Sequence, residues 1–117
     1  MKKQLTLFFT GIFLFGLYLV ACKKKDEYAN LNCSQIASAY NANIKPIISA
    51  HCLSSGCHGT GSANGDFTTY AGLKAAADNG QLDSRVLRDK NMPPSGALST
   101  DDRDRIKCWL NNGSPNN

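Results

Sequence analysis

The chain has 117 residues, 42% of them hydrophobic, and a formal net charge of +4. We interpret residues 1–21 as a removable targeting segment, which leaves 96 residues, enough for one small domain and too few for two. Those 96 residues contain only 19 large apolar side chains once alanines and cysteines are set aside. A core this small usually needs crosslinks, a metal or a cofactor, which excludes a large self-sufficient enzyme core.

The positive charge is concentrated at the front of the chain. From Leu31 onward, eight Lys and Arg residues stand against seven Asp and Glu, a net charge of +1. No stripe of basic residues interleaved with aromatic residues occurs, so we expect no nucleic-acid partner.

The first 21 residues have the pattern of a secretory signal peptide. Lys2 and Lys3 precede an apolar run of 16 positions over residues 5–20, and a small residue follows it. A retained membrane helix is the alternative interpretation. The run of 16 positions is short for it, because a spanning helix usually needs about 20 apolar residues.

Residues 19–22, Leu-Val-Ala-Cys, lie where this run ends. They resemble the lipobox of bacterial lipoproteins, which implies that Cys22 is acylated and becomes the N-terminus of the mature protein. Residues 23–27 are similar to the export signal of some surface lipoproteins. We therefore expect a protein of the bacterial cell envelope, lipid-anchored in the outer membrane and facing the periplasm or the cell surface. Residues 22–32 are polar and without hydrophobic periodicity, which predicts a flexible tether.

The remaining residues, 33–117, are predicted to form one all-α domain. Ile44, Ile47 and Ile48 share one face of a helix predicted over 44–51, with Asn43 as its N-cap. A second helix is predicted over 70–77.

Further helical structure is predicted downstream. Thr69 is the expected N-cap of the helix over 70–77. A short helical turn opening at Asp83 or Ser84 carries Val86 and Leu87. The clearest helix starts with a capping-box-like sequence at Ser99, presents an apolar stripe and ends at Gly113. The stripe consists of Ile106, Trp109 and Leu110.

Two irregular stretches, 59–66 and 91–98, separate these helices. Both contain Gly or Pro, and both are long for so small a domain. Loops of this kind often carry function.

Four cysteines remain once Cys22 is assigned to lipid: Cys33, Cys52, Cys57 and Cys108. In an oxidising compartment, two disulfides are the simplest explanation. The residues next to Cys52 and Cys57 favour a different explanation.

Cys52, Cys57 and His58 form the pattern C-x4-C-H. C-x-x-C-H is the attachment signature of c-type haem, in which two thiols add to the haem vinyl groups and the adjacent histidine ligates iron. The spacing here is two residues longer, and flexible Gly56 would let the intervening loop bulge. The pattern predicts Cys52 and Cys57 as thioether residues and His58 as the proximal ligand.

Met92 supplies the second expected axial ligand. It lies 34 residues after His58 in the sequence Asn-Met-Pro-Pro, and the two prolines stiffen the loop that carries its thioether. Iron in His/Met coordination takes a thioether of this kind as its sixth ligand. A core-filling methionine is the alternative.

Residues 43–113 as a whole resemble class I (mitochondrial-type) cytochromes c. The resemblance is greatest to small bacterial monohaem domains, which carry Ile-x-Pro-Ile before the cysteine motif, Met-Pro-Pro before a Ser/Thr-Asp helix start, and a late tryptophan. It implies a cytochrome c-like helical domain with long loops wrapped around one covalent haem c, whose first and last helices cross at a haem edge. A bound haem would also add apolar surface to the small core, worth on the order of 10 kcal/mol of burial.

The same helix crossing would bring Cys33 close to Cys108. We expect a disulfide between them, and two free buried thiols are the alternative.

We therefore expect a carrier that passes single electrons between redox partner proteins outside the cytoplasm, and not an enzyme, because both axial positions of iron are filled. One alternative is a haem-free, disulfide-stapled lipoprotein acting as a structural or binding module. Another is a haem enzyme such as a small peroxidase, if Met92 is labile. Zinc binding by the Cys/His motif and His51 is disfavoured because adjacent residues rarely converge on one tetrahedron. His51 is expected to be a surface or capping histidine.

Overall fold

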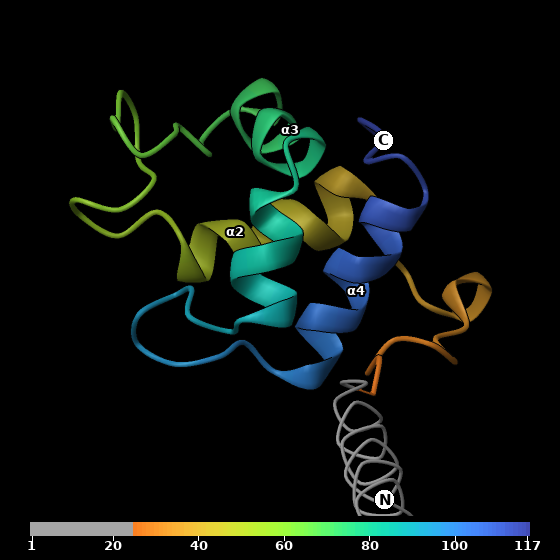
Figure 1. Cartoon of the computed structure of the whole chain (residues 1–117). Helices are drawn as coiled ribbons and strands as arrows, with labels where there is room; N and C mark the ends of the chain where they lie inside the picture. Colours follow the sequence, from red (N-terminus) through yellow and green to blue (C-terminus); the bar gives the residue numbers. More distant parts are fainter. Residues whose placement is uncertain (1–24) are drawn as a thin grey trace, which may run out of the picture.

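The computed structural model describes residues 25–117, and this part of the chain is helical and contains no strand (Figure 1). The predicted all-α class is therefore confirmed for the described part. The predicted signal peptide and the lipidation site at Cys22 lie outside the described residues. Within residues 25–117, no helix combines the length and the apolar character needed to cross a membrane.

Short helices and two long loops make up the domain. Elements η3 and η4 are π-helical, and η2 is a single 3-10 turn. The elements follow in the order η2 (Cys33–Gln35), η3 (Tyr40–Ile44), α2 (Lys45–His51), α3 (Tyr70–Asp78), η4 (Asp83–Arg88) and α4 (Thr100–Asn111).

The first helical unit starts earlier than the sequence predicts. Element η3 begins at Tyr40 and continues directly into α2, so Asn43 lies inside the unit and its assignment as N-cap is wrong. Its side-chain oxygen instead accepts a hydrogen bond from the N–H of Ala39 at 3.0 Å, which satisfies a free donor at the true start. Pro46 lies in the first turn of α2, a position at which a helix tolerates proline.

The two later caps are confirmed. The side chain of Thr69 accepts a hydrogen bond from the N–H of Gly72 at 3.2 Å at the start of α3. The side chain of Ser99 accepts one from the N–H of Asp102 at 3.1 Å at the start of α4. Gly113 follows the end of α4 with a φ of +83°, the left-handed conformation that favours glycine after a helix.

The core lies where η3 and α2 meet η4 and α4. Ile44, Ile106 and Trp109 are fully buried in one apolar cluster, and Val86 and Leu87, carried by η4 where a helical turn was predicted, join it. The ring of Tyr40 stacks on Trp109 with a centroid distance of 6.0 Å. The first and last helical units therefore pack against each other around Trp109.

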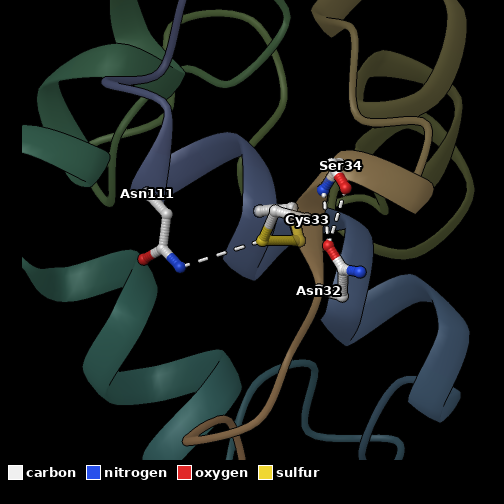
Figure 2. Close-up of a disulfide and its surroundings, with 5 residues drawn as sticks. Asn32, Cys33, Ser34 and Asn111 are labelled. Atoms are coloured by element: carbon white, nitrogen blue, oxygen red, sulfur yellow. Dashed lines mark hydrogen bonds between the residues drawn. A yellow bond between two sulfur atoms is a disulfide. The ribbon is translucent and has the colours of Figure 1, made fainter.

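A disulfide joins Cys33 to Cys108, with Cα atoms 5.2 Å apart (Figure 2). Cys108 is fully buried beside Trp109 in α4, and Cys33 lies in η2. Asn32 accepts hydrogen bonds from the N–H and the hydroxyl of Ser34 beside the bridge. The crosslink thus ties the start of the domain to its last helix.

The segment before Cys33 is more ordered than the predicted tether. The side chain of Tyr28 packs against the core cluster, and Glu27 forms an ion pair with Arg103 of α4 at 2.9 Å. Residues 27–28 of the tether predicted over 22–32 thus lie on the domain. Hydrophobic periodicity cannot detect a contact made by one aromatic and one acidic side chain.

Replacing Cys33 and Cys108 together by Ala should lower the free energy of unfolding by about 4 kcal/mol, because the bridge closes a loop of 75 residues in the unfolded chain. Urea denaturation followed by circular dichroism measures the change. A reductant should destabilise the unsubstituted protein and leave the double variant unaffected. Equal stability of the two proteins would contradict the prediction.

Candidate functional site

A cavity of about 650 Å³ lies at the C-terminal end of α2, between the two long loops. Figure 1 shows both loops, residues 52–69 and 91–99, on the same side of the molecule. Cys52, Cys57, His58 and Met92 all line this cavity. The remaining lining residues are His51, Gly56, Ala63, Asn64, Phe67, Ala76, Gln81, Leu82, Arg85, Val86, Pro93 and Pro94.

The two cysteines reach the cavity from a turn that follows α2. Cys52 ends the helix, where its N–H donates to the carbonyl of Ile48 at 2.8 Å. The N–H of Cys57 donates to the carbonyl of Ser54 at 2.9 Å, and Gly56 has a φ of +79°. This is the glycine at which the sequence predicted a bulge. Both cysteines are free thiols, so the structure contains one disulfide among its described residues and not two.

Burial of the Cys52 thiol raises its pKa to about 11, and the neighbouring Cys57 thiol adds to the effect. Cys52 is therefore protonated at neutral pH. A reactive cysteine nucleophile has the opposite property, a pKa lowered toward neutrality by nearby positive charge. The surroundings of Cys52 thus do not favour a catalytic cysteine.

The imidazole of His58 is held by its backbone neighbours. Its Nδ1 lies 3.2 Å from the carbonyl oxygen of Gly65, and because a carbonyl only accepts, Nδ1 carries the hydrogen. The tautomer with its hydrogen on Nδ1 has a lone pair on Nε2, the arrangement that metal-ligating histidines adopt. The ring of Phe67 stacks parallel to the imidazole with a centroid distance of 4.0 Å. Together these contacts fix the plane of a potential ligand.

The loop that supplies Gly65 rests on α3. A side chain at Gly72 is impossible without movement, because its Cβ would lie 1.7 Å from the carbonyl oxygen of Asp66. The Asp66 carboxylate accepts hydrogen bonds from the backbone of Thr68 and Gly61 at 2.9 and 3.0 Å. The hydrogen bond from the Thr68 hydroxyl is the main cause of a lowered pKa of Asp66, and the two backbone bonds add to it. An ionised Asp66 therefore organises the loop behind His58.

Met92 lies on the second loop and is accessible. Its exposed fraction is 36%, the one exposed large apolar side chain among the described residues. The N–H groups of Asn91 and Met92 both donate to the carbonyl of Arg85, at 3.0 and 3.2 Å, which anchors the start of the loop to η4. The alternative of a core-filling methionine is therefore wrong, and the thioether is free to meet a group in the cavity.

Three polar lining residues, Asn64, Gln81 and Arg85, were not predicted from the sequence. Gln81 and Arg85 come from the region of η4, and both are exposed at the cavity. Their spacing of four places them on one helical face, but the sequence around them predicts only a short turn. His51, expected on the surface, is exposed and also lines the cavity.

No three His, Cys, Asp or Glu side chains come together as a potential metal site within residues 25–117. A tetrahedral zinc site needs such a group, whereas haem iron takes one axial ligand from each face.

Comparison with family models, with curated proteins and with solved structures finds no match to this chain. The residues of the cavity are therefore the basis for inferring what it binds.

Gly72→Ala should destabilise the protein by about 2 kcal/mol or more, because the new Cβ would push the Asp66 carbonyl and the loop behind His58 away from α3. The same change at an unobstructed helical glycine stabilises by about 0.5–1 kcal/mol. Urea denaturation measures the difference. Ala71→Gly, at an exposed position of the same helix, is the matched control and should cost only about 1 kcal/mol. A stabilised Gly72→Ala protein would show that the loop does not pack as described.

Proposed function

We propose that this protein is a lipid-anchored monohaem c-type cytochrome that passes single electrons between redox partner proteins outside the cytoplasm. The observation that carries this proposal is the meeting of Cys52, Cys57, His58 and Met92 around one cavity. Met92 lies 34 residues from His58, and local sequence rules do not require the two loops to meet.

The cavity fits a haem in size and lining. Its volume of about 650 Å³ is within the range of roughly 300–1,000 Å³ that is usual for cofactor sites. Phe67, Leu82 and Val86 supply apolar walls, as a porphyrin face requires. Two free thiols lie at the same cavity, in a protein that elsewhere forms a disulfide.

Each of the four residues has a defined role in this proposal. Cys52 and Cys57 would hold haem c through thioether bonds, His58 Nε2 would be the proximal iron ligand, and the sulfur of Met92 the distal one. The hydrogen bond to Gly65 orients the imidazole. Bound haem supplies reversible one-electron chemistry at iron, while the chain binds it, orients it and limits the access of water. If His58 and Met92 both ligated the iron, no position on it would be left for a substrate, so we propose a carrier and not an enzyme.

The arrangement of the helices supports a cytochrome c-like domain. Element η3 packs against α4 around Trp109, which agrees with the crossing of first and last helices in that family. The long loops at the cavity would then wrap the haem.

Two cysteines, Cys22 and Cys33, support the proposed location. The Cys33–Cys108 bridge fits an oxidising compartment outside the cytoplasm. An acylated Cys22 would anchor the domain to the outer membrane through its acyl chains, each buried CH2 contributing about 0.8 kcal/mol.

A haem-free, disulfide-stapled structural or binding module is the second candidate. The Cys33–Cys108 bridge favours it. A haem-free module, however, gives no role to the two free thiols of Cys52 and Cys57 beside the oriented imidazole of His58.

Protein produced in a host with haem-attachment machinery should be coloured and show a sharp α band on reduction. The colour should stay with the polypeptide after acid–acetone extraction, because thioether bonds survive it. A Cys52→Ser/Cys57→Ser variant should lose its colour in the extraction, whereas the matched Cys33→Ser/Cys108→Ser variant should keep it. Colourless protein from a competent host would refute the proposal and favour the stapled module.

Met92→Ala should abolish the near-infrared sulfur–iron band and lower the midpoint potential on the order of 0.1 V, within the roughly 0.8 V that axial ligands span. Absorption spectroscopy and a redox titration measure the two effects. Ser95→Ala in the same loop is the control and should leave both unchanged. An unaltered band in Met92→Ala would remove Met92 from the site.

A further inference from the structure

Glu27 contacts Lys90, at the start of the loop that carries Met92, and Arg103 of the helix that follows this loop. One carboxylate oxygen pairs with the ammonium group of Lys90, which immediately precedes residues 91–98. The other oxygen lies 2.9 Å from Nη2 of Arg103, in the first turns of α4. Hydrogen bonds from Lys90 and Arg103 lower the pKa of Glu27, so it is ionised at neutral pH.

Arg103 transmits this contact to the far end of the loop. Its Nη1 donates to the carbonyl of Leu98, and its Nη2 donates to Glu27. Nε is buried without a hydrogen-bond partner among the described residues, so the two Nη groups make all of its hydrogen bonds there. Only 8% of the residue is exposed, and a buried, planar guanidinium that makes two such bonds has little freedom to move.

The loop has few other backbone restraints. Asn91 and Met92 donate to Arg85 at its start, and the N–H of Gly96 donates to Pro93 within it. Pro93 and Pro94 have no N–H to donate. Among the described residues, the bond from Arg103 is therefore the hydrogen bond that joins the end of the loop to the rest of the domain, and the buried side chain of Leu98 packs in the core cluster.

We propose that Glu27 is a positioning residue for Met92: by pairing with Lys90 and Arg103 together, it holds both ends of the 91–98 loop at the distance that the thioether needs to reach the cavity. The part played by Met92 rests on the proposed function. Four residues separate Glu27 from Cys22. The segment next to the proposed lipid anchor therefore also contributes a contact that positions the loop.

Two measurements on Glu27→Gln test this role. In the haem-loaded protein, the substitution should leave covalent haem content unchanged and weaken the sulfur–iron band, with partial recovery in Glu27→Asp. In the Cys52→Ser/Cys57→Ser background, freed of non-covalently held haem before the measurement, hydrogen exchange of the 91–98 segment should become about two- to fivefold faster. Exchange in α3 should not change.

Asp89→Asn is the matched control. It removes the same charge beside Lys90 from a carboxylate that is exposed and forms no ion pair within residues 25–117. Lys90→Gln, which keeps the Glu27–Arg103 pair, should reproduce the faster exchange even if Glu27→Gln folds poorly.

The outcomes separate this proposal from the proposed function. If Glu27→Gln and Asp89→Asn give the same exchange rates and the same band as the unsubstituted protein, Glu27 does not position the loop, while the cytochrome assignment stands. If the unsubstituted protein takes up no haem, the cytochrome assignment fails, and the exchange data alone decide whether Glu27 holds the loop.

Discussion

The packing of η3 against α4 around Trp109 is the interaction on which the rest of the structure depends. Trp109 is fully buried, stacks on Tyr40 and donates from its indole nitrogen to the carbonyl of Pro115 at 2.9 Å. Element η3 continues into α2, which ends at Cys52, and α4 carries Cys108 and Arg103. One aromatic contact therefore sets the positions of the thiol-bearing turn, of the disulfide and of the residue that holds the methionine loop.

The small number of large apolar side chains explains why the domain is built around a cavity. The buried cluster occupies the space between the helices, and the two loops enclose a volume that this core does not fill. A flat, mostly apolar cofactor would complete such a structure, since close packing of an interior contributes to stability. The small number of large apolar side chains, which excludes a large enzyme core, thus favours a domain assembled around a bound group.

Local rules predicted much of this fold, and non-local contacts account for what they missed. Thr69 and Ser99 were predicted as caps because an N-cap depends on residues two or three positions away. The sequence cannot show that Glu27 meets Arg103, or that Gly72 is needed for the approach of Asp66, because those contacts depend on the folded chain. For the site, Cys52, Cys57, His58 and Met92 were identified by residue type and spacing. Gln81 and Arg85 were not, because a polar residue in a predicted turn carries no chemical signature.

The intact mass of the mature protein is the most direct test of covalent haem attachment through Cys52 and Cys57. For protein made where attachment enzymes are present, we predict a mass about 616 Da above that of the polypeptide with its acyl groups and its disulfide. A mass fully explained by the polypeptide, the acyl groups and the disulfide would contradict the account.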